Sequence, residues 1–337
     1  MFTVGMVMKA LIVDNYGHPR AARIGEIDKP QLKDGSLLVK IHAAGINPFD
    51  YKLITGAVKD FMPISFPHVP GMDGAGVVDE IGQGVQGWRK GDPVLGMFET
   101  GTLAEYALIA AKSKRLARKP DALDFVRAAA MPEAGLTATT IVRAANVRQG
   151  QSVFVIGATG GLGLFTMQLA KLNGARIIAT GKATDAEYLR RLGADDFIDY
   201  GAGDALEQVH QRYPGGVDVV VDVINTGDAL LRDANVIRQG GTLVSSLSGP
   251  EQSAFPSGVT VHYIQLNAKD GDLEDLARRA ASGDLQVEIG HAYAFSQAAQ
   301  AFVDLYYPAK HTRGKLVVEV QPEATKTSHD VRDCSKS

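Results

Sequence analysis

The sequence predicts an α/β protein of two parts, in which a doubly wound parallel sheet follows a β-rich barrel. Its 337 residues, 45% of them apolar, are enough for two hydrophobic cores. Residues 35–101 contain short apolar runs that Gly and Pro interrupt frequently, which is typical of a barrel. Residues 153–264 instead alternate strand-sized apolar runs with helical periodicity, which indicates a parallel sheet covered by helices.

The second part begins with a buried strand, a glycine-rich turn and a helix. The apolar run Val153–Ile156 is followed by helical periodicity from Leu162 onward. Gly160 allows a phosphate group to approach the backbone closely, and Gly163 allows the helix to pack tightly on the strand. The first N–H groups of such a helix lack intrahelical acceptors and bind anions. This stretch therefore predicts a dinucleotide site.

The glycine fingerprint at this turn departs from the usual pattern. Ala158 occupies its first position, so the spacing is A-x-G-x-x-G, with Gly161 beside the second glycine. The following β-α unit supports the interpretation, because a short strand at residues 176–180 is followed by Thr184-x-x-Glu187, a capping box that opens a helix. A plain glycine turn between a strand and a helix is the alternative.

The end of this second strand bears on which dinucleotide binds. NAD enzymes place Asp or Glu about 20 residues after the first glycine position, where it binds the ribose 2′-hydroxyl. Residues 178–182 contain no acid and end at Lys182. A small residue followed by a lysine leaves room and positive charge for a 2′-phosphate, so the sequence favours NADPH. An ordinary solvated lysine is the alternative.

Further strands and helices extend this pattern along the chain. We expect strands at residues 8–13 and 39–43 in the first part, and an Ala-rich helical stretch at residues 123–140 between the parts. The other strands are expected at residues 197–200, 217–223, 242–245 and 259–264, near Val287 and at 315–320, and the other helices at 273–282 and from Ser296. Periodicity leaves open whether the last elements end the second part or rejoin the first.

Composition excludes several classes of function. With 35 basic and 38 acidic residues, the chain lacks the positive charge of a nucleic-acid binder. No apolar run reaches the roughly 20 residues that span a membrane. Residues 3–7 are too short for a signal peptide and lack its basic flank, so we expect a cytoplasmic protein. Cys334 is the only cysteine and lies in a polar tail, residues 321–337, that we expect to be disordered; this excludes an internal disulfide, a thiolate zinc site and a cysteine nucleophile.

Several stretches, in order along the chain, resemble the zinc-independent quinone oxidoreductases of the medium-chain dehydrogenase/reductase superfamily. The stretches are residues 43–52, 70–78, 91–94, 101–106, 131–138, 157–163 and 313–318. The resemblance implies an α/β fold, with a Rossmann doubly wound parallel sheet and a GroES-like β-rich barrel that meet at the active-site cleft. It implies a GroES-like domain at residues 1–122, a Rossmann domain at 123–265 and a return to the catalytic domain at 266–320.

The same resemblance bears on whether the chain binds a catalytic metal ion. Zinc alcohol dehydrogenases of the superfamily bind a catalytic zinc with Cys where this chain has Asn47, and have a His-Glu pair where it has Met72-Asp73. Met and Asn do not supply the imidazole and thiolate ligands of such a site, so we expect no metal. Without a Lewis acid, the acceptor has to spread negative charge by itself, as quinones and α,β-unsaturated ketones do.

On the substrate side, the resemblance implies Asn47, Tyr51 and Lys52. Lys52 would stabilise an enolate or hydroquinone anion, and Tyr51 would donate a proton or stack on a ring. Many relatives carry tyrosine at the position of Lys52, so this chain resembles the enone reductases as much as the quinone reductases. A packed Tyr51 and a surface Lys52 are the alternatives. Asp50 and Asp73 fit turn or helix-cap positions as well as they fit catalytic ones.

On the cofactor side, the resemblance implies residues from several turns of the second part. Thr137, Ser245 and Leu247 would lie near the nicotinamide, and Lys182, Tyr200 and Arg313 around the adenosine 2′-phosphate. The residues implied at the pyrophosphate turn are Ala158, Gly160, Gly161, Leu162 and Gly163.

Three hypotheses of function follow. The leading one is an oxidoreductase that transfers a hydride from NADPH to a quinone or a similar conjugated carbonyl compound without metal. An enone or enoyl double-bond reductase is the nearest alternative, and a non-catalytic NADPH-binding structural or sensor protein is the alternative of another class. The resemblance also implies a homodimer, in which the strand at residues 259–264 lies at a sheet edge and pairs with its copy.

Overall fold

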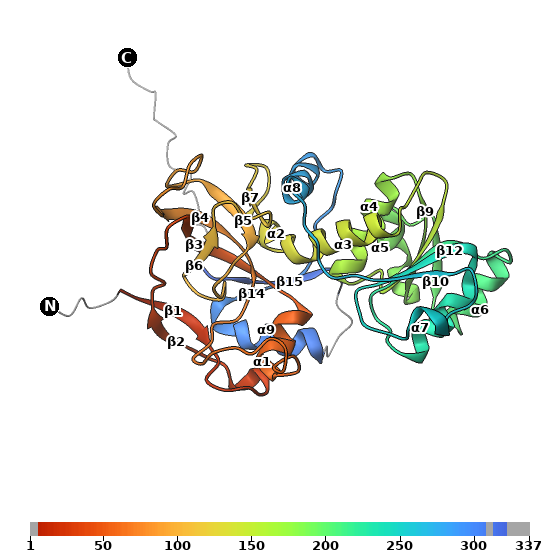
Figure 1. Ribbon diagram of the computed structural model, residues 1–337, viewed down its shortest axis with the longest axis horizontal. Coiled ribbons are helices and arrows are strands. Elements are labelled where there is room, and N and C mark those ends of the chain that lie inside the picture. The colour runs from red at the N-terminus through yellow and green to blue at the C-terminus, as the bar shows by residue number, and fades with distance from the viewer. Residues whose placement is uncertain (1–5, 308–312, 322–337) are drawn as a thin grey trace, which may run out of the picture.

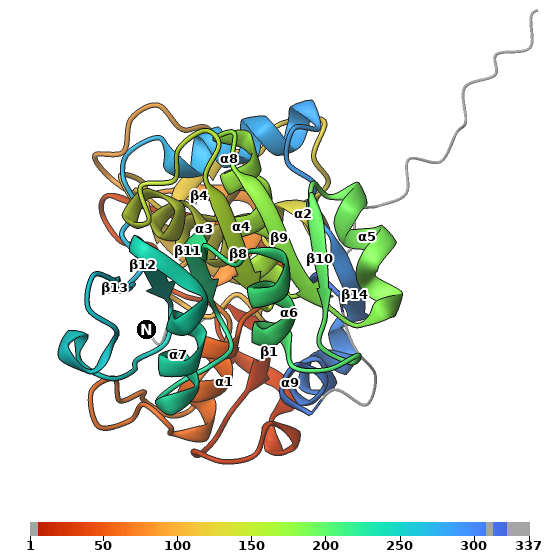
Figure 2. The same ribbon diagram turned by 90° about the vertical axis from the view of Figure 1, so that its right-hand side faces the viewer.

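The computed structural model describes residues 6–307 and 313–321, which form two lobes (Figure 1). The β-rich lobe contains the first strands of the chain and also the last one. The other lobe contains the parallel sheet and its helices, and Figure 2 looks onto it.

The second lobe is built on a six-stranded parallel sheet in the order β10-β9-β8-β11-β12-β13. Its strands are β8 (Ser152–Ile156), β9 (Arg176–Gly181), β10 (Asp196–Asp199), β11 (Val217–Asp222), β12 (Ile237–Ser245) and β13 (Thr260–Tyr263). The chain starts in the middle of the sheet and winds outward on both sides, which is the strand order of dinucleotide-binding folds. The predicted doubly wound parallel sheet is confirmed.

Helices cover both faces of this sheet. Side chains alternate along β8, so Val153 and Val155 pack toward one face with Leu164, while Phe154 packs toward the other with Leu230. The helices that follow the strands are α4 (Gly161–Leu172), α5 (Ala186–Arg191), α6 (Ala205–Arg212) and α7 (Asp228–Asp233). Because both faces are buried, the strands consist of nearly continuous apolar runs.

The first lobe is built on a seven-stranded sheet. Six of its strands follow the order β14-β15-β3-β4-β5-β7, and the seventh, β6, pairs with β3. These strands are β3 (Ser36–Ile46), β4 (Asp73–Ile81), β5 (Pro93–Met97), β6 (Tyr106–Ala110), β7 (Leu116–Arg118), β14 (Ile289–Ala294) and β15 (Lys315–Glu319). A separate pair, β1 (Val7–Ile12) and β2 (Arg23–Asp28), packs beside them. Because β15 pairs with β3, the last elements rejoin the first lobe, which periodicity had left open.

Helices connect the two lobes. A single apolar cluster includes Leu95 of β5, Leu136 of α3 (Pro132–Ala144), Phe165 of α4 and Leu276 of α8 (Asp272–Ser282). The first lobe also carries α1 (Pro48–Thr55), α2 (Phe125–Ala129) and α9 (Ala298–Tyr306). This shared core fixes the position of the parallel sheet against the barrel.

Several predicted elements differ from the structure, among them β12, which begins at Ile237 and not at residue 242. The helical stretch expected at residues 123–140 is two helices, because Asp124 caps the start of α2 and Pro132 starts α3. The capping box expected at Thr184 and Glu187 does not form; instead, Asp185 accepts the N–H of Lys182 at 2.8 Å. The strand expected near Val287 begins only at Ile289.

The predicted disordered tail and Cys334 lie outside the described residues, apart from Gln321. Within the described ranges, none of the helices is long and apolar enough to cross a lipid bilayer.

Candidate active site

The turn between β8 and α4 has the shape of a phosphate cradle. Gly157 has a φ of 88°, in the left-handed region that favours glycine. A Cβ on Gly163 would collide with the Gly157 carbonyl oxygen, so only glycine allows this close packing of helix and strand. A Cβ on Gly160 would instead meet no atom nearer than 3.6 Å. The outer side of the turn therefore has room for a ligand, and the first N–H groups of α4 are available to an anion.

The start of β15 lies directly against this turn. The Gly314 N–H donates to the Thr159 carbonyl oxygen at 2.9 Å, and Gly160 and Gly314 form a parallel bridge. The aliphatic part of Lys315 occupies the space that a side chain on Gly161 would need. The last strand of the barrel thus joins the phosphate cradle to the first lobe.

Lys315 extends from the cradle into a buried polar network. Its Nζ donates to the Ile46 carbonyl oxygen at 3.0 Å and to Asn47 Oδ1. The Asn47 amide in turn donates to Asp73 Oδ2 at 2.9 Å. Asn47 is 2% exposed and Asp73 is fully buried, so the network is shielded from water.

Two further carboxyl groups, those of Asp50 and Glu133, lie beside Asp73 of this network. We call Asp50, Asp73 and Glu133 the acid cluster. Both oxygens of Asp73 accept the Glu133 N–H at the start of α3, at 3.0 and 3.1 Å. Asp50 Oδ2 accepts the Asn47 N–H at 3.0 Å, so Asp50 occupies a helix-cap position at the start of α1. Asp50 Oδ1 and Glu133 Oε2 are buried and have no hydrogen-bond partner within the described residues.

Burial raises the pKa of all three carboxyl groups. It raises the pKa of Asp50 to about 7, with a further contribution from the charge of Asp73. It raises the pKa of Asp73 only to about 6, because Lys315, Asn47 and the Glu133 N–H favour the ionised form. Burial, followed by the charges of Asp73 and Asp50, raises the pKa of Glu133 well above its usual range. The cluster therefore retains protons near neutral pH.

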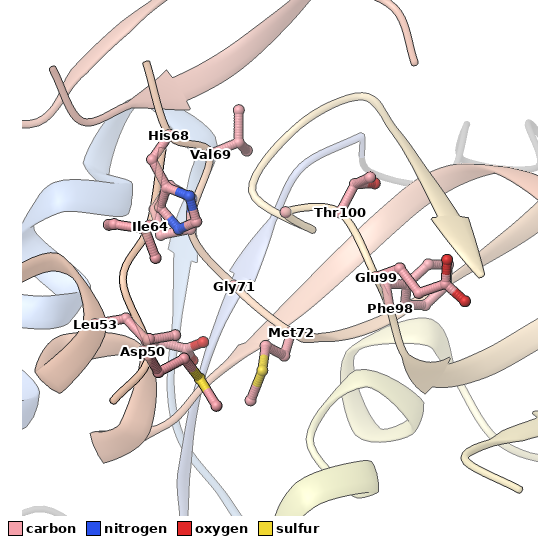
Figure 3. Close-up of a pocket in the computed structure, with 13 residues that line it drawn as sticks. Asp50, Leu53, Ile64, His68, Val69, Gly71, Met72, Phe98, Glu99 and Thr100 are labelled. Carbon is pink, nitrogen blue, oxygen red and sulfur yellow. The ribbon is translucent and has the colours of Figure 1, made fainter. Parts of the chain in front are cut away.

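A cavity of about 150 Å³ opens beside Asp50 (Figure 3). Its lining is mostly apolar and comes from α1, from the segment before β4 and from the loop after β5. The lining residues are Asp50, Leu53, Met62, Ile64, His68, Val69, Pro70, Gly71, Met72, Phe98, Glu99, Thr100 and Gly101. In the close-up, the Asp50 carboxyl group extends from α1 toward Met72, with Phe98 and Glu99 farther away across the opening.

The structure separates the three predicted substrate-side residues. Asn47 lies within the buried network. Tyr51 is 7% exposed and stacks on Tyr306 with ring centroids 3.9 Å apart, so its surroundings favour the packed-aromatic alternative. Burial raises the pKa of Tyr51 to about 12. Lys52 is half-buried, and its charge lowers the pKa of Glu133, which places it beside the acid cluster.

A second cavity lies at the carboxyl ends of the parallel strands. It is lined by residues at or after the ends of β8, β9, β10 and β11, among them Thr180, Tyr200, Asn225, Arg232 and Asp233. Tyr200, predicted to lie near the adenosine, is 46% exposed and forms part of this lining. The crevice at these strand ends, where ligands of open α/β sheets bind, is therefore hollow in this protein.

Two predicted basic residues lie near the end of β9. Lys182 immediately follows this strand and is exposed. Arg313 donates from Nε to Asp185 Oδ1 at 2.8 Å and from Nη2 to the Thr184 carbonyl oxygen at 2.6 Å. The guanidinium of Arg313 thus fixes the segment that presents Lys182.

The remaining predicted cofactor residues are distributed around the same edge of the sheet. Ala158 is fully buried beneath the turn, and Leu162 is half-buried in the first turn of α4. Thr137 lies one helical turn after Glu133 on α3. Ser245 ends β12, and its Oγ accepts the Leu247 N–H at 3.1 Å. None of Thr137, Ser245 and Leu247 lines either cavity.

The sequence analysis assigned no role to Glu133 or Lys315. Both residues lie within stretches that carry the family resemblance, 131–138 and 313–318. A lysine that begins an apolar strand and an acid beside a proline at a helix start were the available signals. Within the part of the chain that the structure describes, no three His, Cys, Asp or Glu side chains have the geometry to hold a metal ion.

Comparisons with known proteins agree with this architecture. Residues 33–121 match the family described as alcohol dehydrogenase GroES-like domain, and residues 192–318 match the family described as zinc-binding dehydrogenase. The chain is 33% identical to an NADPH-dependent alkenal/one oxidoreductase, chloroplastic, of Arabidopsis thaliana, over 92% of this chain and 79% of that one. It is 31% identical to a 2-methylene-furan-3-one reductase of Solanum lycopersicum, over 94% and 80%.

A solved structure gives the same result. The quinone oxidoreductase from Coxiella burnetii has a TM-score of 0.82 and 28% identity, and the match covers 93% of this chain and 99% of that one. The chain therefore belongs to the zinc-independent quinone oxidoreductase family of the medium-chain dehydrogenase/reductase superfamily, and it is an oxidoreductase.

Proposed function

We propose that this protein uses NADPH to reduce a quinone or an α,β-unsaturated carbonyl compound without metal. One observation carries the proposal. Lys315 packs its stem on the phosphate cradle and places its ammonium in the polar network beside the Asp50 cavity. A nucleotide on the cradle and an acceptor in the cavity would therefore occupy neighbouring sites.

The residues of the cradle and its surroundings fit a phosphorylated dinucleotide. The N–H groups of Gly161, Leu162 and Gly163 would bind the pyrophosphate. Lys182 and Arg313 would face the 2′-phosphate, and the exposed ring of Tyr200 would contact the adenosine. Thr137, Ser245 and Leu247 would flank the nicotinamide, where the bound cofactor supplies a hydride.

The cavity suits a flat, conjugated acceptor. Its apolar wall excludes water from the substrate and holds it in position. Lys52, beside the acid cluster, would stabilise the negative charge that develops on a carbonyl oxygen. The printed names of the relatives include both an alkenal/one oxidoreductase and a quinone oxidoreductase, so both acceptor classes belong to the proposal.

A titration and a side-by-side assay test this function. NADPH and NADH are titrated separately into the protein, and a simple quinone and a simple enone are then offered with the tighter cofactor. We expect tighter binding of NADPH and turnover of at least one acceptor. Tight NADPH binding with turnover at the background rate for both acceptors would instead support the non-catalytic alternative.

We also propose that the protein is a homodimer, because β13 lies at the edge of the parallel sheet, as expected from the sequence. The cytoplasmic location stays a prediction, since one relative is described as chloroplastic. Fractionation of cells that produce the full chain tests it.

A further inference from the structure

We propose that Asp50 is the catalytic acid of this protein and gives its proton to the carbonyl oxygen of the acceptor. This inference rests on the proposed function. A hydride added to the conjugated acceptor carries two electrons, which leave an electron pair on a carbonyl oxygen. The O–H bond of Asp50 then breaks, a new O–H bond forms on the acceptor, and the Asp50 carboxylate regains a proton from water. A reduced quinone is completed in this way, whereas an enone gives an enol that tautomerises to the ketone.

The position of Asp50 suits a proton donor. The residue is 1% exposed and lines the cavity, and its carboxyl group extends from α1 toward Met72 (Figure 3). Oδ2 accepts the Asn47 N–H, and the nearby Met72 N–H also favours the ionised carboxyl group, whereas Oδ1 is buried and makes no close hydrogen bond among the described residues. A buried polar atom without a hydrogen bond destabilises the folded protein. A hydrogen bond between the neutral carboxyl group and a ligand in the cavity would remove this destabilisation.

Burial and the charge of Asp73 favour the neutral form of Asp50, whereas Lys315 favours its ionised form less strongly. The acid cluster has three carboxyl groups, and Lys315 is the cation bound within it. Lys315, the Asn47 amide and the Glu133 N–H at the start of α3 stabilise Asp73 as an anion. The acid cluster therefore carries its negative charge on Asp73. Of the other groups nearby, Lys52 acts on Glu133, while His68 and Glu99 line the cavity at some distance from Asp50.

Asp50 is better suited to this role than Tyr51. A general acid works best when its pKa lies near the working pH. Burial raises the pKa of Asp50 to about 7 and that of Tyr51 to about 12. Tyr51 also packs against Tyr306 and does not line the cavity.

The proposal predicts a pH profile. Asp50 holds its proton below about pH 7 and loses it above, so kcat should fall as the pH rises through about 7. Since the carboxyl groups interact, this midpoint belongs to the cluster.

Asp50→Asn provides the first test. The new amide oxygen can still accept the Asn47 N–H, so the cap of α1 is kept, but no proton can be transferred. We expect kcat to fall by roughly 10²-fold or more and the decline above pH 7 to disappear, while the Kd for NADPH stays within about twofold. Asp124→Asn is the matched control, because Asp124 also caps a helix, accepting the Arg127 N–H at 2.7 Å, but lies outside both cavities.

A second measurement needs neither a variant nor turnover. Carboxyl ¹³C chemical shifts of the cofactor-free protein are followed against pH, with Asp50→Asn used to assign the Asp50 signal if it folds. Because the pKa values of Asp73 and Asp233 are also raised, a midpoint near 7 supports the proposal only for the signal that Asp50→Asn removes, and an ordinary midpoint near 4 for that signal, or for all aspartates, overturns it. Full activity of a folded Asp50→Asn variant also overturns it. Failure of the wild-type protein to reduce any acceptor would instead refute the proposed function, so the two failures are distinguishable.

Discussion

The proposed preference for NADPH is tested most directly at Lys182, an exposed residue that follows β9. Replacing it by Glu would repel a 2′-phosphate and offer a hydrogen-bond acceptor to a ribose 2′-hydroxyl. We expect Lys182→Glu to weaken NADPH binding about tenfold or more, or at least 1.4 kcal/mol, and to change NADH binding much less. Fluorescence titration with both nucleotides measures this.

Lys112→Glu is the matched control, since Lys112 is also exposed but lies in the barrel lobe. It changes the net charge by the same amount, so it should leave both affinities unchanged. An unaltered preference for NADPH in Lys182→Glu would remove Lys182 from the site.

Asp50 also links the stability of the protein to pH. Its pKa is about 7 in the folded protein and about 4 in an unfolded chain. The folded state therefore binds more protons than the unfolded state between these values, and the stability that Asp50 contributes is lost as the pH rises through about 7. From pH 5 to pH 8, wild type should lose on the order of 1–3 kcal/mol more unfolding free energy than Asp50→Asn. Urea unfolding at both pH values measures this difference, and equal losses in the two proteins would contradict it.

The individual site residues differ in how far the sequence predicts them. Gly163 could be predicted, because its role depends on a turn of a few residues. The contact of Lys315 with Asn47 could not, since the two residues are 268 positions apart and meet only when β15 pairs with β3. The acid cluster has the same origin, for its members come from α1, β4 and α3.

The strand-turn-helix unit of β8 and α4 gives a prediction at the scale of an element. Gly163→Ala puts a methyl group against the Gly157 carbonyl oxygen, which is backbone and cannot move away easily. We expect a loss of roughly 1–3 kcal/mol of unfolding free energy, together with weaker NADPH binding. Thermal and urea unfolding measure the first effect, and cofactor titration the second.

Gly160→Ala is the contrasting variant in the same turn. Its φ of −79° suits any residue, and its Cβ would make only an ordinary contact, 3.6 Å from the Gly157 carbonyl oxygen. The fold should therefore keep its stability, while the methyl group, on the side where the pyrophosphate is expected, should weaken NADPH binding. Equal losses of unfolding free energy in Gly163→Ala and Gly160→Ala would contradict the difference in packing between these two glycines.

Among the elements, strands that are buried along most of their length could be predicted from their apolar runs. Strands that contain both exposed and buried residues without regular alternation could not. The buried strands β8 and β9 begin and end within one residue of the prediction. The first half of β12, with Arg238 and Gln239 exposed and two glycines, has no alternating pattern. β14 is likewise mostly exposed, with Tyr293 alone deeply buried, so its periodicity is weak.

At the scale of the whole molecule, the return of the chain to the barrel could not be predicted from periodicity. β15 is an apolar run that would also fit the parallel sheet. Its place is decided by long-range pairing with β3 on one side and β14 on the other. This pairing also brings Gly314 and Lys315 to the phosphate cradle, so the same step of folding completes the barrel and assembles the site.

The proposed homodimer depends on the outer edge of β13. Gln252 already occupies part of this edge, because its amide donates to the Val259 carbonyl oxygen and accepts the Val261 N–H, each at 2.8 Å. Since the Ile264 N–H faces β12, where it donates to the Ser245 carbonyl oxygen, the Tyr263 N–H points outward. A second copy would therefore pair with the edge at Tyr263.

Tyr263→Pro removes this outward N–H and should convert the dimer to a monomer, because an edge without its donor cannot complete the pairing. Tyr263→Ala keeps the N–H and loses the same side chain, including its hydrogen bond to the Pro250 carbonyl oxygen, so it should remain dimeric. Light scattering after size-exclusion chromatography at micromolar concentration gives the mass of each. A wild-type mass of one chain would refute the dimer, and a dimeric Tyr263→Pro variant would move the interface away from this edge. Because the pairing leaves the phosphate cradle and the Asp50 cavity within each chain, the monomer should still bind NADPH.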